Sequence, residues 1–408
     1  MKDKIIADLH IHSRYSRATS KDLTIKNLVK WAKIKGINLL GTGDFTHDKW
    51  LEEIRNELYE ENGFLIPKED KNSNIKFIFS GEISLVYSKD NKGRRVHLVL
   101  LAPDFEIVNK INKYLDKKGR RDYDGRPIFN ISCKDFVKDI KSISEDIEII
   151  PAHCMTPWFG IFGSKSGFNS LKEAFEEQED KIYAVETGMS ADPEMLWKFS
   201  FLNKKTILSF SDSHSYWPWR LGREATIFNP ISNYKDLIEQ IRNNNIYATI
   251  EVNPAYGKYH YDGHRFCNFS CNPEITKELN NICPKCNKEL TIGVENRTLQ
   301  LADQDSYMFH SKKPFFKVLP LHEIISLVYE IKMNSNKVWK IYNEIIDKFE
   351  NEFNVLLNVS KEELLRNKFE EKLINAIIDN RIGNIKVIPG YDGVYGKAIL
   401  KGEQKTLF

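Results

Sequence analysis

The sequence predicts an α/β fold whose first 250 residues form a barrel of seven strands joined by helices. Two observations support this fold class. Short apolar runs, typical of buried strands, recur at residues 4–7, 37–40, 75–79, 96–101, 147–150, 182–185 and 206–210. Amphipathic stretches such as residues 23–35 and 133–143 lie between several of these runs. Such alternation is typical of parallel strands with crossover helices, and seven strands in one domain favour a barrel over an open sheet.

The pattern changes after residue 250, which predicts two further domains. A stretch rich in Tyr, His and Gly leads into a cluster of four cysteines. The pattern after Pro320 is helical, and Ser360 followed by Glu363 is a capping-box signature. We expect helices at residues 321–331, 337–357 and 360–379, a strand at 385–389 and a glycine-rich turn at 390–396. The predicted domains are a barrel at 1–250, a cysteine domain at 251–298 and a helical C-terminal domain at 299–408.

The composition excludes several classes of protein. The 60 Lys and Arg residues nearly balance the 57 Asp and Glu residues, which gives a formal net charge of +3. This charge argues against a strongly basic protein that coats nucleic acid, although it leaves room for a local basic groove. The sequence has no long apolar run typical of a membrane span and no signal-peptide core, so we expect a cytoplasmic protein.

Histidines and carboxylates gather at the ends of the predicted strands. His10 and His12 follow the first run at alternate positions, so both can face one metal ion; two surface imidazoles are the alternative. The later runs add Asp44, Glu82, His97, His153, Asp212 and His214. Imidazoles mixed with carboxylates suit Zn, Mn or Fe better than Ca or Mg alone. Their number exceeds the need of one ion and predicts two or three.

These motifs resemble the polymerase and histidinol phosphatase (PHP) superfamily over about residues 1–250. The resemblance rests on DLHIHS, GTGD, GE, RRVH, PAH and SDSH. It implies a metal-dependent phosphoesterase on a distorted seven-stranded β/α barrel. The implied metal ligands are His10, His12, Asp44, Glu82, His97, His153, Asp212 and His214. One departure is Phe45, which stands where many members of the superfamily carry histidine.

The resemblance also suggests roles around the metal ions. Glu82 is expected to bridge two ions, and Asp8 to orient a ligand histidine from behind. Arg220 and Arg223, in the segment RLGRE, are candidates to hold phosphate oxygens, with surface salt bridges as the alternative. The divalent ions would be Zn, Mn or Mg, and they would activate a water molecule for attack on phosphorus.

The four clustered cysteines predict a structural zinc ion. Cys267 and Cys271 form one pair, and Cys283 and Cys286 form a second pair in the tight sequence CPKC. Paired thiolates on two turns match a zinc ribbon, with a redox pair as the alternative. The first pair has one residue more between its cysteines than is usual, so His264 is a possible substitute for Cys271.

The arrangement of the whole chain resembles the endonuclease Q family. The motifs PAHCMTPW, ETGMSAD, RLGRE, GKYH, CPKC and PGYDGVYG carry this resemblance over nearly the full length. It implies cleavage of DNA, double-stranded or single-stranded, on the 5′ side of uracil, hypoxanthine, xanthine or an abasic site. The products would carry a 3′-hydroxyl and a 5′-phosphate. The alternatives are a small-molecule phosphoesterase of the histidinol phosphatase kind and a non-catalytic DNA-binding adaptor.

Several residues near the predicted ligands are candidates for contact with DNA. Trp158, Phe159, Tyr216 and Trp217 are placed to stack on a base or to wedge a duplex, with packing of the barrel mouth as the alternative. Glu186, in ETGMSAD, is a candidate to contact metal-bound water or a base edge, with a buried structural carboxylate as the alternative.

The end of the chain resembles the start of a peptide that binds a sliding clamp. Gln404, Leu407 and Phe408 supply the glutamine, the leucine and one aromatic anchor. A replication sliding clamp is therefore a predicted partner, with a disordered tail as the alternative.

Overall fold

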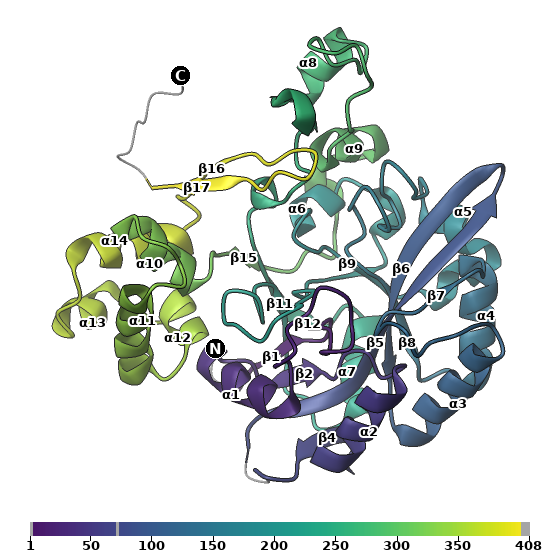
Figure 1. The fold of residues 1–408 in the computed structure, drawn as a ribbon, viewed down its shortest axis with the longest axis horizontal. Coiled ribbons are helices and arrows are strands. Elements are labelled where there is room, and N and C mark those ends of the chain that lie inside the picture. Colours follow the sequence, from purple (N-terminus) through teal and green to yellow (C-terminus); the bar gives the residue numbers. More distant parts are fainter. Residues whose placement is uncertain (1–2, 71–72, 401–408) are drawn as a thin grey trace.

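An 11-stranded mixed sheet organises this computed structural model, which describes residues 3–70 and 73–400 (Figure 1). Its strands are β1 (Ile5–Asp8), β2 (Leu39–Gly41), β3 (Leu58–Glu61), β4 (Phe64–Pro67), β5 (Lys76–Lys89), β6 (Lys92–Ala102), β7 (Ile128–Phe129), β8 (Glu148–Pro151), β11 (Ala225–Phe228), β12 (Ile246–Glu251) and β15 (Phe315–Lys317). The main path runs β15-β12-β11-β1-β2-β5-β4-β3, and β6, β7 and β8 extend it from β5. A separate parallel pair, β9 (Ala184–Glu186) and β10 (Thr206–Leu208), follows in sequence.

Each of the seven apolar runs of the sequence overlaps a strand, but the strands are not all parallel. β1, β2 and β5 run parallel, whereas β6 is antiparallel to both β5 and β8. Asp90 and Asn91 join β5 to β6 with φ values of 52° and 58°. Two consecutive residues with positive φ make the tight turn of a hairpin, which leaves no room for a crossover helix. The predicted crossover is therefore wrong at this point.

The strands curve around a common centre. The backbone N–H of Cys154, just after β8, donates to the carbonyl of Glu186 at the end of β9, with an N···O distance of 2.8 Å. Ile11, just after β1, pairs with Ser213, which follows β10. The carboxyl ends of β1, β8, β9 and β10 therefore converge on one place.

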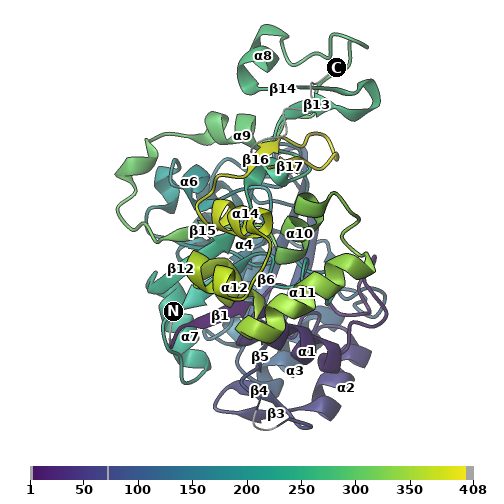
Figure 2. The same cartoon turned by 90° about the vertical axis from the view of Figure 1, so that its left-hand side faces the viewer.

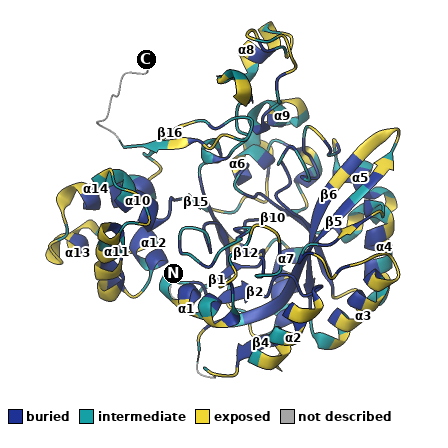
Figure 3. Cartoon of the chain, viewed as in Figure 1, coloured by how far each residue is buried: buried dark blue, intermediate teal, exposed yellow. Residues whose placement is uncertain are grey.

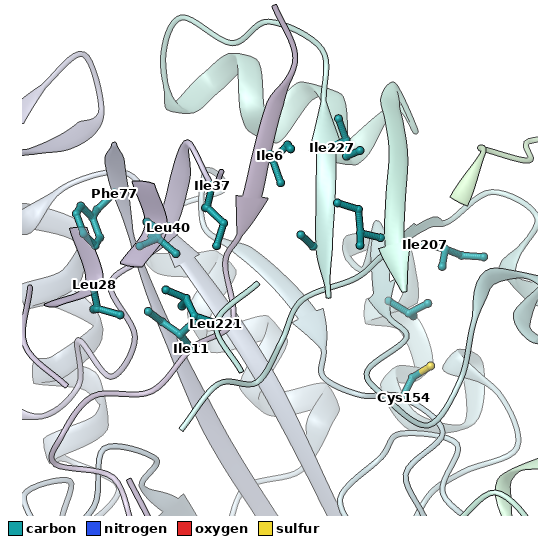
Figure 4. Packing of buried hydrophobic residues seen from close by; sticks show 14 of the residues in the cluster. Ile6, Ile11, Leu28, Ile37, Leu40, Phe77, Cys154, Ile207, Leu221 and Ile227 are labelled. Atoms are coloured by element: carbon teal, nitrogen blue, oxygen red, sulfur yellow. The ribbon is translucent and has the colours of Figure 1, made fainter. Parts of the chain in front are cut away.

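Apolar side chains between the strands and the helices form the core. Ile6, Leu40 and Ile227 belong to one large buried cluster, in which the labelled side chains pack between neighbouring elements (Figure 4). The central strands are mostly buried, and exposed residues concentrate on the outer helices (Figure 3). This burial removes apolar surface from water, which is the main favourable contribution to folding.

Helices cover the outside of the sheet. They are α1 (Ile25–Lys35), α2 (Asp48–Glu57), α3 (Phe105–Asp116), α4 (Cys133–Ile143), α5 (Leu171–Phe175), α6 (Pro193–Leu196) and α7 (Tyr234–Arg242). The α1 helix begins where the Thr24 hydroxyl accepts from the N–H of Asn27, and it ends at Gly36, whose φ is 95°. Within residues 3–70 and 73–400, none of the helices combines the length and the apolar character that a bilayer crossing requires.

The cysteine-containing segment projects beside a C-terminal hairpin (Figures 1 and 2). The segment comprises β13 (Asp262–His264), β14 (Phe269–Cys271), α8 (Pro273–Glu278) and α9 (Val294–Leu301), and the hairpin comprises β16 (Lys386–Ile388) and β17 (Lys397–Ile399). The N–H of Arg265 donates to the Asp392 carboxylate at 2.8 Å, and the Tyr391 hydroxyl donates to Asn268 at 2.7 Å. The glycine-rich turn near the C-terminus therefore supports the cysteine-containing segment.

Five helices near the C-terminus pack against one another. They are α10 (Leu321–Tyr329), α11 (Asn336–Phe349), α12 (Glu352–Leu357), α13 (Lys361–Arg366) and α14 (Glu371–Arg381). Of these, α11 and α12 contact α1. The capping box of Ser360 and Glu363 is confirmed. Two predicted helices are each divided, because Glu350 and Lys368 adopt φ values of 71° and 60° that a right-handed helix cannot contain.

Candidate functional site

Glu82 lies at the centre of the converging strands and joins two groups of side chains. Its Oε1 atom is 2.7 Å from His97 Nδ1 and 3.2 Å from His153 Nε2. Its Oε2 atom is 3.3 Å from His12 Nε2 and 3.6 Å from His10 Nε2. Because each carboxylate oxygen faces a different pair of imidazoles, Glu82 has the geometry of a bridge between two metal sites.

The two groups have donor sets that suit a divalent transition metal. One consists of His10, His12, Glu82 and Asp212, and the other of Glu82, His97 and His153. Within each group the candidate ligand atoms lie within 4.8 Å of one another. The Nε2 atom of His10 is buried and has no hydrogen-bond partner among the described residues. A metal ion would satisfy this nitrogen, so the residues fit divalent metal binding.

Charge interactions within the cluster shift its pKa values strongly. Burial would raise the pKa of Glu82, but His97, Arg126 and His10 outweigh burial and hold that pKa well below its usual range. Burial lowers the pKa of His97 to about 4, despite the opposing charge of Glu82. Glu82 is therefore ionised and His97 neutral at neutral pH, which are the forms that bind a metal ion.

The pKa values of the other three imidazoles shift in the opposite direction to that of His97. Burial would lower the pKa values of His10, His12 and His153, but the neighbouring carboxylates outweigh burial and raise them. A metal ion would therefore displace protons from these imidazoles.

The backbone at two of these positions is held in an uncommon conformation. His153 has a φ of 32° and Asp212 a φ of 48°. Residues other than glycine rarely adopt positive φ, and such positions concentrate at functional sites. Gly188 permits the close approach at His153, since a Cβ atom on Gly188 would lie 2.5 Å from the Cβ of His153.

Two carboxylates lie behind the histidines of the first group. Glu186 Oε2 is 2.8 Å from His10 Nδ1, and Asp44 Oδ1 is 3.0 Å from His12 Nδ1. Each carboxylate orients an imidazole so that its Nε2 faces Glu82, an arrangement common behind metal-binding histidines. Glu186 is fully buried, which agrees with the alternative of a buried structural carboxylate rather than with contact to metal-bound water or a base edge. Asp44 was expected as a ligand. Asp44 is instead engaged by His12 and by two serines, because the N–H of Ser13 and the hydroxyl of Ser16 donate to its Oδ2.

Asp8 anchors a loop rather than a ligand histidine, which corrects the sequence-based expectation. Its carboxylate accepts from the backbone N–H of Ser211 at 3.0 Å, from the Ser211 hydroxyl at 2.5 Å and from the N–H of Gly222 at 2.8 Å. Burial raises the pKa of Asp8 to about 6, against the opposing effect of these hydrogen bonds. Asp8 therefore fixes both ends of the loop that carries Asp212.

His214 lies beside the cluster and outside both ligand groups. Its Nδ1 atom is 2.9 Å from the carbonyl oxygen of Asp212, and its ring centroid is 4.4 Å from that of His12. The Nδ1 atom faces a backbone carbonyl two residues earlier, which leaves Nε2 as the nitrogen that could bind a metal ion. His214 lines the cleft together with His97, His153 and Asp212, and its expected role as a ligand stays a prediction.

A cleft of about 640 Å³ opens over the ligand groups. Trp158 and Phe159 line it; the Trp158 ring meets Tyr259 edge to face at 5.4 Å, and Phe159 lies 4.2 Å from the His97 ring. Their contact with DNA stays a prediction. Tyr395, from the glycine-rich turn, also lines the cleft. The cleft therefore has aromatic walls above an acidic and histidine-rich floor.

The two arginines of RLGRE differ in their surroundings. Both line the cleft. Arg223 is buried, and its guanidinium lies 2.9 Å from the Glu323 carboxylate on α10. Its charge is therefore already paired, which corrects the expectation that it holds phosphate. Arg220 is partly exposed and is the stronger candidate for that contact.

Tyr216 and Trp217 differ from the expectation that they contact DNA. The Trp217 ring lies 5.4 Å from Trp31 of α1 and 5.4 Å from Trp339 of α11. Tyr216 is buried and stacks on Trp31 at 6.4 Å. These aromatic side chains join the barrel to the C-terminal helices, and the sequence did not reveal the partner ring on α11.

Arg126 belongs to this site although no sequence motif pointed to it. Its Nη1 atom donates to Glu82 Oε2 at 2.9 Å. The residue lies in the loop between α3 and β7, in the sequence DGRP, which matches none of the ligand motifs. The neighbouring basic run at residues 117–121 was the only signal in this part of the sequence.

The cysteine-containing segment forms a separate group of possible zinc ligands. His264, Cys267, Cys283 and Cys286 lie together, and Cys271 is not among them. The Nδ1 atom of His264 is 3.1 Å from Cys267 Sγ and 3.3 Å from Cys286 Sγ. A set of three cysteines and one histidine suits tetrahedral zinc.

The register of the β13–β14 hairpin explains why His264 replaces Cys271. His264 pairs with Phe269 next to the loop that carries Cys267, whereas Cys271 pairs with Asp262 two residues farther along the strand. Two residues of a strand span roughly 6.6 Å, which carries Cys271 away from the other three cysteines. The Cys271 thiol instead contacts the Thr276 hydroxyl at 3.2 Å.

This arrangement predicts different effects for two substitutions. We expect His264→Ala to weaken zinc binding by more than about 100-fold, the upper end for residues that only support a ligand. Cys271→Ser should weaken it by less than about tenfold. Zinc content after dialysis against a graded series of chelator concentrations measures both effects. Loss of zinc from Cys271→Ser alone would contradict the assignment of His264.

One family model and two related sequences match parts or all of the chain. Residues 320–384 match the family described as MJ0043 C-terminal domain. The chain is 32% identical over 295 residues to uncharacterized protein MJ0043 of Methanocaldococcus jannaschii, a match covering 70% of this chain and 35% of that protein. It is 26% identical over 416 residues to uncharacterized protein YqxK of Bacillus subtilis, a match covering 97% of this chain and 99% of that protein. The match to the M. jannaschii protein therefore spans about a third of that relative's length.

Solved structures match the fold over its whole length. The lesion-specific endonuclease PfuEndoQ from Pyrococcus furiosus superposes with a TM-score of 0.86 at 29% identity, covering 98% of this chain and 96% of that one. A second solved structure is a complex of endonuclease Q with a 27-mer duplex substrate that has an abasic lesion at the active site. It superposes with a TM-score of 0.85 at 29% identity, covering 98% of this chain and 97% of that one. The whole chain thus has the fold of endonuclease Q, and the resemblance that its motifs predicted is confirmed.

Proposed function

We propose that this chain is a metal-dependent DNA-repair endonuclease. It would hydrolyse the phosphodiester on the 5′ side of a deaminated base (uracil, hypoxanthine or xanthine) or of an abasic site, leaving a 3′-hydroxyl and a 5′-phosphate. The observation that carries this proposal is the likeness to endonuclease Q over the full length of both chains, including the complex with an abasic duplex. The bridging position of Glu82 below the cleft adds a chemical reason.

The metal ions belong to the proposal. His10, His12, Glu82 and Asp212 would hold one divalent ion, and Glu82, His97 and His153 a second, with Zn, Mn or Mg as candidates. The two ligand groups around Glu82 favour two ions over three. When bound, such ions neutralise phosphate oxygens and lower the pKa of a water molecule towards 7, which provides a nucleophile. A structural zinc ion would be held by His264 and three cysteines.

The side chains around the ions would prepare the site before substrate arrives. Glu186 and Asp44 hold His10 and His12 with Nε2 towards the centre, so little reorganisation is needed. Asp8 fixes the loop of Asp212. Arg220, on the wall of the cleft, would bind a phosphate oxygen.

The cleft would receive the nucleotide at the lesion. A base must leave the stack before an enzyme can inspect it, and extrusion costs least where pairing is already weak. Trp158, Phe159 and Tyr259 offer aromatic surface at the cleft for an unstacked nucleotide. The cleft volume of about 640 Å³ is in the range of small-molecule sites.

Several finer expectations from the sequence stay predictions. They are the closed seven-stranded PHP barrel, the domain boundaries at residues 250 and 298, the zinc-ribbon class and the cytoplasmic location. Binding of a sliding clamp through Gln404, Leu407 and Phe408 also stays a prediction, and these residues lie outside the described part of the chain.

A nicking assay tests the proposed function. Labelled duplexes would carry uracil, hypoxanthine, xanthine, an abasic site or normal bases at one position, with Mg²⁺, Mn²⁺ or Zn²⁺ present. We expect a single nick immediately 5′ of the lesion and little cleavage of the normal duplex. Extension by a polymerase identifies the 3′-hydroxyl, and removal of label by a phosphatase identifies the 5′-phosphate.

Two results would decide against the proposal. Intact lesion duplexes under all three metal conditions would contradict endonuclease activity. Rapid hydrolysis of a phosphomonoester without nicking would favour the small-molecule phosphoesterase instead.

A further inference from the structure

We propose that Arg126 is a catalytic residue, a fixed cation that binds a non-bridging oxygen of the scissile phosphate. This inference rests on the proposed function. In the structure its Nη1 atom donates to Glu82 Oε2, the same oxygen that faces His10 and His12. The guanidinium therefore lies at the edge of the ligand cluster, within reach of a group bound there.

The guanidinium has free hydrogen-bonding capacity. Of its five N–H groups, only one, on Nη1, has a hydrogen-bond partner among the described residues. The side chain is 26% exposed. Its other nitrogen atoms are absent from the buried polar atoms that lack a partner, so they remain available to a ligand. Arginine presents donors in a planar fork that matches two phosphate oxygens, so a phosphate can be bound while contact with Glu82 persists.

The loop of Arg126 packs closely against the candidate ligand cluster. Gly125 packs so closely that a Cβ atom there would lie 2.2 Å from Asp44 Oδ2 and 2.3 Å from the Ser16 hydroxyl. The Gly125 carbonyl accepts from the Thr46 hydroxyl at 3.2 Å, and its N–H donates to the Tyr15 carbonyl at 3.2 Å. A donor held this rigidly needs little reorganisation when charge develops on a substrate.

On the same side of the cluster, the Asp44 carboxylate is fully engaged by described residues and is not free to hold another metal ion. Both oxygens of Asp44 are used, by His12, Ser13 and Ser16. The next residue, Phe45, is buried against Phe79 and Gly81 and supplies no ligand atom. Arg126 thus places a positive charge of the chain itself against Glu82 at this edge.

In the proposed reaction, the positive charge of Arg126 would stabilise the transition state. Water adds to phosphorus while the bond from phosphorus to O3′ breaks; the water oxygen stays on the 5′-phosphate, and a proton passes to the departing O3′. Negative charge grows on the non-bridging oxygens as the transition state forms. A guanidinium hydrogen-bonded to one of them stabilises that state more than the ground state, which is the condition for catalysis.

The contact between Arg126 and Glu82 should also affect metal binding. In the metal-free protein Arg126 neutralises the carboxylate oxygen that a metal ion needs. Removing the guanidinium should therefore strengthen metal binding while it weakens phosphate binding and turnover. A residue that only supports the fold would weaken all three together.

The test uses Arg126→Gln and Arg126→Lys, with Arg17→Gln as the matched control. Arg17 is 76% exposed and pairs with Asp124 of the same loop at 3.3 Å, so it reports loss of a charge without contact with Glu82. Calorimetric titration of Mn²⁺ into metal-free protein gives metal affinity. Titration of inorganic phosphate into the Mn²⁺-loaded protein gives phosphate affinity, and single-turnover nicking gives the rate.

We expect Arg126→Gln to raise Mn²⁺ affinity several-fold, to weaken phosphate binding about tenfold, and to lower the nicking rate by roughly 10²- to 10³-fold, the cost of removing one preorganised donor. Arg126→Lys should retain part of the rate, and Arg17→Gln should behave like the unmodified protein. Unchanged phosphate affinity, or a parallel loss of metal affinity and melting temperature, would overturn the inference. The two calorimetric measurements need no DNA, so they remain decisive if the protein fails to nick any duplex.

Discussion

Replacing Glu82 by glutamine is expected to lower the rate of nicking by about 10³-fold or more. The amide keeps the shape of the side chain but loses the charge that both ligand groups share. A metal ion contributes several kcal/mol of transition-state stabilisation, and each ~1.4 kcal/mol corresponds to a factor of ten in rate. Because Glu82 belongs to both groups, this one substitution should weaken the binding of both metal ions. Metal content by elemental analysis should fall together with the nicking rate.

A suitable control for this substitution is Glu148→Gln. Glu148 is also buried, on β8, and its carboxylate lies 2.8 Å from Arg242, away from the cleft. This variant measures the effect of losing a buried carboxylate that has no metal to bind. Glu82→Gln with more than a tenth of the normal nicking rate would contradict the bridging role.

Glu352→Ala is expected to lower the free energy of unfolding by about 3–5 kcal/mol, the usual cost of leaving a buried charge without its partner. Glu352 Oε1 accepts from Lys35 Nζ at 2.6 Å, and Glu352 Oε2 accepts from the Tyr342 hydroxyl at 2.8 Å. Burial lowers the pKa of Lys35, and the Glu352 charge opposes that shift. Denaturant titration followed by fluorescence of the interface tryptophans measures the loss.

Two further variants separate the ion pair from general packing. Glu344→Ala removes an exposed carboxylate 4.0 Å from Lys340 on α11 and should change stability by less than about 0.5 kcal/mol. The double variant Lys35→Met with Glu352→Met should recover most of the loss, since no buried charge is then unpaired. A single variant Glu352→Ala that is as stable as Glu344→Ala would contradict the prediction.

The sequence predicted the strands and the ligand types well, because both depend on local patterns. Apolar runs identify buried strands, and histidines at alternate positions after a strand identify a common face. The direction of β6 was not predictable from its apolar run, since it depends on two positive-φ residues, Asp90 and Asn91. Asp and Asn adopt positive φ more readily than most residues, so the Asp90-Asn91 pair is a hairpin signal that the expectation of a crossover helix overlooked.

The roles of the carboxylates were harder to predict than their presence. Asp44, Glu186 and Asp8 all follow strands, but the atom that each one faces depends on contacts between distant segments. Arg126 reaches Glu82 from a loop 44 residues away in sequence, which no motif records. In the same way, the exchange of Cys271 for His264 follows from strand register, which spacing alone leaves open.

The loop between Asp212 and Arg223 serves two parts of the molecule at once. Its first residue lies among the candidate metal ligands, its aromatic middle packs on α1 and α11, and its last residue pairs with Glu323 on α10. We expect that a metal ion that fixes the first residue of this loop would also stabilise its contacts with α10 and α11, through thermodynamic linkage. Loading the centre with Mn²⁺ should slow hydrogen exchange in α10 and α11, and cutting away these helices should weaken Mn²⁺ binding by the reciprocal amount. We therefore expect the region matched by the MJ0043 C-terminal domain family to contribute to the stability of the candidate metal centre.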